Sequence, residues 1–297
     1  MKYHATLLFL IALVYCASTY AKNTLIEPVV TKVNDQVYVL LGPVGIPSKE
    51  NRGYMVNSTI IIGDNGVILI DTGFTDEIGR HIKNIIAGIT SKPVTHIINS
   101  HHHGDHVLGN SEFRDAEINS AAKCKELVEK SGYEWIQLVE SMTGFSFPNT
   151  KPVPADTVFP ENTQTSVKLQ GVELNLWVPK GSHTPGDMMV YLPRYKILVG
   201  GDILVHTMTP SFRDADVKTW IGTLKQITKM EIDTIVPGHG PLMTVDDVKL
   251  MHKHMAKLYA GIEAGYKKGL TDSEIRQTLD LHEWKKMKNF DLLMGMN

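Results

Sequence analysis

The feature that most constrains this chain is the stretch His101-His102-His103-Gly104-Asp105-His106, which concentrates donors for a divalent metal. The apolar, β-branched run Val94–Asn99 precedes it and predicts a buried strand. From Val107 onward the sequence predicts a helix, so the six residues form a loop at the C-terminal end of a strand. Because α/β folds place ligand sites at such strand ends, we expect this loop to bind a metal ion.

The spacing within the loop predicts which side chains act together. On an extended segment alternate residues share a face, so His101, His103 and Asp105 point to one side and His102 to the other. His106 follows where the chain turns into the helix. We therefore expect His102 to lie behind the ligands or on the surface.

A plan of hairpin, aspartate, helix, strand and histidine-bearing loop occurs twice along the chain. In the first half its parts are Tyr54–Ile70, Asp71, Thr75–Ala87, Val94–Asn99 and the loop at 101–106. In the second half they are Met188–Val199, Asp202, Val217–Lys229, Thr234–Val236 and the loop around His239. Two such halves predict a single α/β domain in which two sheets pack face to face with helices outside, a four-layer αββα sandwich. Its strand ends would bring both sets of donors to one cleft.

Seven nitrogen and oxygen donors follow from this plan. They are His101, His103, Asp105, His106, His183, Asp202 and His239. Donors of this kind without a thiolate suit zinc, with iron or manganese as alternatives. Seven exceed what one tetrahedral ion needs, so we expect two ions, and Asp202 is the natural carboxylate to bridge them.

The motif His101-x-His103-x-Asp105-His106 is followed in order by His183, Asp202 and His239. This pattern resembles the metallo-β-lactamase superfamily over roughly 29–239. The resemblance implies that fold and two zinc ions per chain. It assigns His101, His103 and His183 to the first metal, and Asp105, His106 and His239 to the second, with Asp202 between them. Asp71 matches the family's aspartate that steadies the ligand loop.

The resemblance also implies hydrolysis. Two metals would acidify a bound water and so supply hydroxide near neutral pH, with Asp105 as the catalytic residue that orients the nucleophile or relays its proton.

Asp202 is similar to the carboxylate that glyoxalase II and the broad hydrolase branch of the superfamily carry at this position. The zinc β-lactamases closest in layout usually carry Cys there and Lys three residues on, where this chain has Val205. The run Phe290–Asn297 looks like the tail of periplasmic hydrolases associated with quinoprotein and sulfur-oxidation gene clusters.

We therefore predict an exported dinuclear zinc hydrolase that cleaves an ester, thioester or lactam bond in a small molecule. A true β-lactamase is the first alternative, and a mononuclear iron enzyme similar to persulfide dioxygenases comes from another class. A non-catalytic binding module would show broken ligand motifs, and none is broken here. The formal charge of −2 gives no basic surface for nucleic acid.

The N-terminal 21 residues have the pattern of a secretory signal peptide. A basic start precedes the apolar run Ala5–Cys16, and small residues end at Ala21. Cleavage there would leave residues 22–297 as one domain, with C-terminal helices from about 244. The mature protein would then be periplasmic or secreted and would have no stable membrane anchor. An uncleaved anchor or a buried first helix remains the alternative. If cleavage after Ala21 removes Cys16, Cys124 is the single thiol, and we expect it to be a buried apolar residue.

Three loops are expected to set specificity, namely 42–53, 140–154 and 206–212. Glu140–Pro154 carries apolar side chains on an irregular connection. It predicts either a flap over the cleft or a segment that packs on the domain's own surface.

Overall fold

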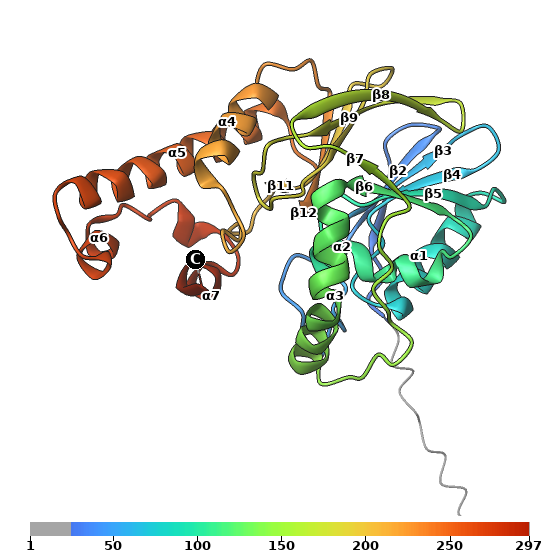
Figure 1. Ribbon diagram of the computed structural model, residues 1–297, viewed down its shortest axis with the longest axis horizontal. Coiled ribbons are helices and arrows are strands. Elements are labelled where there is room, and N and C mark those ends of the chain that lie inside the picture. Colours follow the sequence, from blue (N-terminus) through green and yellow to red (C-terminus); the bar gives the residue numbers. More distant parts are fainter. Residues whose placement is uncertain (1–24, 297) are drawn as a thin grey trace, which may run out of the picture.

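Two β-sheets pack face to face and carry helices on their outer faces (Figure 1), in a computed structural model that describes residues 25–296. This arrangement confirms the predicted four-layer α/β sandwich. The predicted signal peptide lies outside the described residues.

The first sheet contains seven strands in sequential order. They are β1 (Val29–Lys32), β2 (Val37–Leu41), β3 (Ser58–Ile62), β4 (Val67–Ile70), β5 (Val94–Ile98), β6 (Glu117–Ala121) and β7 (Thr157–Phe159). Strands β1 to β4 pair antiparallel, and β4 to β7 pair parallel. The parallel strands therefore end at one edge, where the histidine-rich stretch follows β5.

The second sheet contains five strands in the order β12-β11-β10-β9-β8. They are β8 (Thr163–Leu169), β9 (Val172–Val178), β10 (Met189–Leu192), β11 (Ile197–Val205) and β12 (Thr234–His239). Only β11 and β12 pair parallel. The ends of these two strands bring Asp202 and His239 to the same edge of the sheet.

The helices divide between the two outer faces (Figure 1). Those beside the first sheet are α1 (Asp76–Ile89), α2 (Gly104–Val107), the 3₁₀ helix η1 (Leu108–Glu112) and α3 (Ala122–Thr143). Those beside and beyond the second sheet are α4 (Val217–Ile227), α5 (Val245–Lys267), α6 (Asp272–Thr278), η2 (Trp284–Lys286) and α7 (Phe290–Met296). Thr75 caps α1 as predicted, since its side chain accepts from the Ile78 amide.

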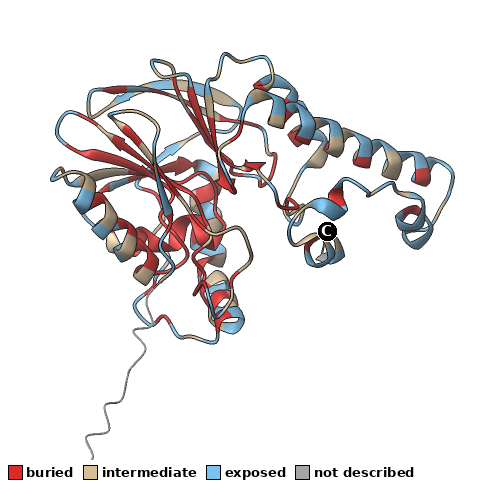
Figure 2. Cartoon of the chain, turned by 180° about the vertical axis from the view of Figure 1, so that it is seen from behind, coloured by how far each residue is buried: buried red, intermediate tan, exposed pale blue. Residues whose placement is uncertain are grey.

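Alternate residues of the second sheet belong to two different cores, as the two-residue period of a strand requires. Val190 and Val199 pack in the core between the sheets. Leu198 and Ile235 pack in a second core against α4 and α5, around Trp220. The part of the second sheet formed by β10, β11 and β12 is therefore buried on both faces, whereas β8 and β9 leave their outer face partly exposed. Figure 2 shows the buried residues concentrated along the strands.

The C-terminal helices project from the sandwich. Figure 1 shows α5 running away from the sheets, with α6 and α7 folded back below it. Most of their surface is exposed (Figure 2). Within residues 25–296, no helix has both the length and the apolar character needed to cross a bilayer.

The structure departs from the predicted elements at three places. Strands β6 and β7 were not predicted. Helix α3 continues to Thr143, into the connection that was expected to be irregular from Glu140, and Gly144 in the left-handed conformation ends it. The helix predicted from Val107 begins earlier, at Gly104, so the last part of the histidine-rich stretch is a helical turn rather than a loop.

Candidate metal centre

The turn of α2 decides how the histidine-rich stretch presents its donors. His103 is the extended residue before the helix, and Asp105 and His106 lie within it. The simple alternation expected of an extended loop therefore holds for His101 and His103 only. Gly104 allows the turn, because a Cβ there would lie 2.4 Å from the Phe74 ring.

Asp202 lies inside β11 rather than after it. The pairing of β11 with β12 is irregular on both sides of Gly201, which has a positive φ of 51°. On the facing strand, a Cβ at Gly238 would meet the Asp202 Oδ1 atom at 1.9 Å. Glycine at 238 is therefore required for the Asp202 carboxylate to reach the site, next to His239 at the end of β12.

The first group of donors contains His101, His103, His183 and Asp202, whose ligand atoms all lie within 4.8 Å of one another. His183 Nε2 is 3.1 Å from His103 Nδ1 and 3.6 Å from Asp202 Oδ2. The three histidines are buried. The structure thus brings together the three histidines predicted for the first metal.

The second group contains Asp105, His106 and His239. His239 Nε2 lies 3.1 Å from Asp105 Oδ2, and His106 Nε2 lies 3.4 Å from the same oxygen. Asp202 also faces this group, with Oδ1 3.3 Å from His106 Nε2 and Oδ2 3.4 Å from His239 Nε2. Its carboxylate therefore lies between the two groups, where a bridge was predicted.

Asp71 holds the second group from behind. Its Oδ2 atom is 2.8 Å from His106 Nδ1 and accepts from the Ser100 hydroxyl at 2.7 Å, while Oδ1 accepts from the Ser100 amide at 2.8 Å. Asp71 has a positive φ of 60°, which Asp tolerates better than most residues. The Ser100 hydroxyl is also 3.0 Å from His101 Nδ1, so this pair steadies both ends of the ligand stretch.

Three further contacts hold the outward-facing nitrogens of ligand histidines, and sequence reasoning found none of them. His103 Nε2 is 2.9 Å from Asp214 Oδ2. His183 Nδ1 is 3.2 Å from the Ser211 carbonyl oxygen. His239 Nδ1 is 3.0 Å from the Met55 carbonyl oxygen. Each contact points the opposite ring nitrogen into the site.

Several inward-facing atoms are buried and have no hydrogen-bond partner among residues 25–296. They are His101 Nε2, His106 Nε2, Asp105 Oδ2 and Asp202 Oδ1. Leaving such atoms unpaired is costly, and imidazole nitrogens and carboxylate oxygens are ligands of zinc. The donor set therefore fits divalent metal ions.

Burial and neighbouring charges shift the pKa values of histidines in the two groups in opposite directions. Burial, reinforced by neighbouring histidines, lowers the pKa of His183 to about 3 and that of His101 well below its usual value. Burial also disfavours charged His239, but the Asp202 and Asp105 carboxylates raise its pKa to about 10. Burial thus favours the neutral form of His101 and His183, whereas the two carboxylates favour the protonated form of His239.

His102 is buried rather than on the surface. Its ring lies 4.8 Å from the His103 ring and 6.4 Å from the Trp135 ring. Burial lowers the pKa of His102 to about 3. Of the two places considered for it, the structure supports the one behind the ligands.

The connection after α3 packs on the surface of the domain rather than forming a flap. Phe147 is only 2% exposed, and the Thr150 hydroxyl donates to Asp76 Oδ1 at 2.6 Å. The Arg52 guanidinium lies over the Phe145 ring, 3.9 Å from its centre. This connection is therefore tied to α1 and to the 42–53 loop.

Comparison with known proteins adds a family assignment. A family model described as the metallo-beta-lactamase superfamily matches residues 51–239. A metallo-beta-lactamase type 2 of Bacillus cereus is 27% identical over 62% of this chain and 66% of its own length. An (R)-specific secondary-alkylsulfatase of Pseudomonas is 25% identical over 74% of this chain and 40% of its own length. The chain thus spans about two thirds of the lactamase and less than half of the alkylsulfatase.

Solved structures with the same fold include two metallo-beta-lactamases. One from Pontibacter korlensis superposes with a TM-score of 0.62 at 20% identity, over 77% of this chain and 99% of that one. One from Pseudomonas aeruginosa in a mono-zinc form gives a TM-score of 0.63 at 20% identity, over 78% of this chain and 96% of that one.

Proposed function

Because the chain belongs to the metallo-β-lactamase superfamily of metal-dependent hydrolases, we propose that it holds two zinc ions and hydrolyses an ester, thioester or lactam bond. The observation that carries this proposal is the pair of donor groups that share Asp202. A mononuclear iron enzyme would need only one group, whereas here the second group is complete and supported by Asp71. The donors contain imidazole and carboxylate without thiolate, which suits zinc.

Bound zinc and the residue Asp105 would have different roles in the proposed reaction. When bound, two zinc ions supply Lewis acidity and lower the pKa of a water molecule so that it can act as nucleophile. Asp105 is buried between His106 and His239, where its carboxylate can orient that nucleophile or accept its proton. Although burial opposes ionisation, the charge of His106 keeps the pKa of Asp105 low, so it is a carboxylate at neutral pH.

A cavity lies on the outward side of the first donor group, behind the His103 ring. About 410 Å³ in volume, it is lined by His102, Trp135, Arg213 and Asp214 among others. Asp214 also contacts the ligand His103. Its volume is in the range of small-molecule pockets, roughly 300–1,000 Å³, but none of the seven donors lines it, so the proposal of a small organic substrate rests on the family and not on this cavity.

A β-lactamase activity is the second candidate, because relatives named metallo-beta-lactamase align with this chain. Against it, position 205 is a buried valine, so no lysine at that place can pair with a drug carboxylate. The alkylsulfatase relative makes a sulfate ester a further bond to test. We propose export to the periplasm or outside the cell from the N-terminal pattern alone.

The test is metal analysis of the purified protein together with hydrolysis of a chromogenic lactam, a thioester and a sulfate ester. We expect two zinc ions per chain and turnover of one substrate class. Asp202→Ala should lower both the zinc content and the turnover, because both groups lose a shared donor. Asp233→Ala, which changes a carboxylate outside both groups, is the control and should leave zinc content and turnover unchanged.

One iron per chain, with oxygen consumption on a persulfide and no hydrolysis, would overturn the proposal in favour of the dioxygenase alternative. A chain that binds metal but turns over nothing would favour a binding module.

A further inference from the structure

Two of the three histidines in the first donor group depend on one loop for their orientation. This loop, residues 207–214, is called the support loop here. Its Ser211 carbonyl oxygen lies 3.2 Å from His183 Nδ1, and its Asp214 carboxylate lies 2.9 Å from His103 Nε2. A shift of the support loop would therefore turn both imidazoles away from the metal.

The C-terminal segment holds the start of the support loop through backbone hydrogen bonds. The Lys288 amide donates to the Thr207 carbonyl at 2.9 Å, and the Thr209 amide donates to the Lys288 carbonyl at 3.1 Å. These bonds form a parallel bridge between Met208 and Lys288. Lys288 lies between η2 and α7, so the support loop is paired with the last part of the described chain.

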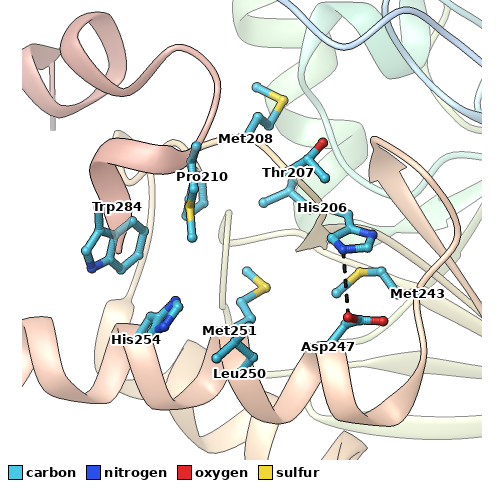
Figure 3. Close-up of a pocket in the computed structure, with 12 residues that line it drawn as sticks. His206, Thr207, Met208, Pro210, Met243, Asp247, Leu250, Met251, His254 and Trp284 are labelled. Carbon is cyan, nitrogen blue, oxygen red and sulfur yellow. Dashed lines mark ion pairs between the residues drawn. The ribbon is translucent and has the colours of Figure 1, made fainter. Parts of the chain in front are cut away.

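The two ends of the support loop are held differently. Near its end, the Phe212 ring lies 5.7 Å from the Trp220 ring and the Arg213 guanidinium 4.5 Å from the Trp135 ring, whereas its start borders a void. A cavity of about 70 Å³ lies between the loop and α5. Figure 3 shows Thr207 and Met208 on one side of it, with Met251 and His254 from α5 on the other and Trp284 at one end. Residues beside a void lose close contacts on that side. The bridge to Lys288 therefore carries more of the loop's positioning than it would in a filled core.

The second donor group has no such dependence. The outward nitrogen of His106 is held by Asp71, and that of His239 by the Met55 carbonyl oxygen. Both supports come from the N-terminal half of the chain. Neither support comes from the support loop or the C-terminal segment. The second group is linked to that region less directly, through the His206 amide, which donates to the His239 carbonyl oxygen at 2.9 Å, and through the shared Asp202.

We propose that the Met208–Lys288 bridge is a positioning element that raises metal affinity in the first donor group more than in the second. The proposal rests on the two-metal centre proposed above. It assigns to the C-terminal segment control over whether the centre holds one metal or two.

The direct test compares Lys288→Pro with Lys288→Ala. Proline removes the amide that donates to Thr207, whereas alanine removes only the side chain. Met287 already has φ −81° and ψ 146°, the region that a following proline prefers. We expect Lys288→Pro to weaken the first group about 10- to 100-fold, the size seen when partners of metal ligands are removed. Lys288→Ala should match the wild type.

Affinities are read by zinc competition against a chromophoric chelator, and the two groups are resolved by NMR of cadmium-loaded protein. Asp214→Asn marks the signal of the first group through His103, and the remaining signal belongs to the second group. Equal weakening of both groups in Lys288→Pro, or no weakening, would overturn the inference. A wild-type protein that binds no zinc would instead overturn the proposed function, so the two failures are distinguishable.

A second measurement needs no substitution and covers the case in which Lys288→Pro fails to fold. Because coupling between two sites is reciprocal, zinc in the first group should stabilise the bridge. We expect slower hydrogen exchange at the Thr209 and Lys288 amides in zinc-loaded wild-type protein than in chelator-treated protein. Unchanged exchange at both amides would contradict the coupling.

Discussion

Asp71 is the residue on which the position of His106 depends most directly. Its two oxygens accept from the Ser100 amide, the Ser100 hydroxyl and the ring of His106. In Asp71→Asn, an NH₂ group replaces one of the two oxygens. In either orientation of the amide, this NH₂ group faces another hydrogen-bond donor, the Ser100 amide in one case and the His106 ring nitrogen in the other. We expect metal affinity in the second group to fall about 10- to 100-fold, and stability to fall by about 1–3 kcal/mol.

Zinc titration and thermal unfolding measure these two effects. The control is Asp115→Asn, which makes the same chemical change at an exposed position and should alter neither quantity. Wild-type zinc binding in Asp71→Asn would show that His106 does not need this support.

Cys124 is predicted to be chemically inert in the folded protein. It is 1% exposed, and burial raises the pKa of its thiol to about 12. Because the thiolate is the reactive form, a thiol reagent at pH 8 should not react with native protein that lacks residues 1–21. One equivalent should react after denaturation. Rapid reaction in the native state would mean that α3 opens readily around this residue.

At the scale of elements, α1 carries two glycines with opposite expected effects. A Cβ at Gly79 would lie 2.6 Å from the Gly109 carbonyl oxygen in η1, whereas one at Gly88 would meet nothing within 4 Å. Gly79→Ala should therefore destabilise the protein by about 1–3 kcal/mol through overpacking. Gly88→Ala should stabilise it by up to about 1 kcal/mol, as alanine does in helices. Denaturant midpoints measure both, and equal midpoints would disprove the close approach of α1 and η1.

Elements with strong local signals could be predicted from the sequence, and those that depend on distant partners could not. The C-terminal helices were expected from about 244, and α5 begins at Val245, because Thr244 and Asp247 form a capping box before an amphipathic run. Strands β6 and β7 are short and lack an apolar alternation. They are strands because each pairs in parallel with its neighbour in the sheet, which no local pattern reveals.

The candidate site divides in the same way. Motif spacing was enough to propose the candidate ligands, and the structure brings them together in two groups. Their supports were hidden, because Asp214 is 111 residues from His103 and the Ser211 and Met55 contacts use backbone oxygens. A backbone carbonyl carries no residue-type signal at all.

Over the whole molecule, each donor group takes members from both halves of the sandwich. His101 and His103 face His183 across the first group, and His106 faces His239 across the second. His101, His103 and His106 follow β5 of the seven-stranded sheet, whereas His183 and His239 belong to the five-stranded half. Metal bound in either group would therefore join the two sheets at their common edge.

This arrangement predicts that metal removal lowers the stability of the entire domain rather than of one loop. A ligand at 100 times its Kd stabilises the folded state by about 2.7 kcal/mol, which corresponds to roughly 5–10 °C in Tm for a domain of this size. We expect calorimetry to show a single transition that shifts down by this amount after chelation and returns with zinc. Magnesium, which prefers an all-oxygen shell, should not restore it. An unchanged Tm after complete zinc removal would mean that the sheets hold this edge together without metal.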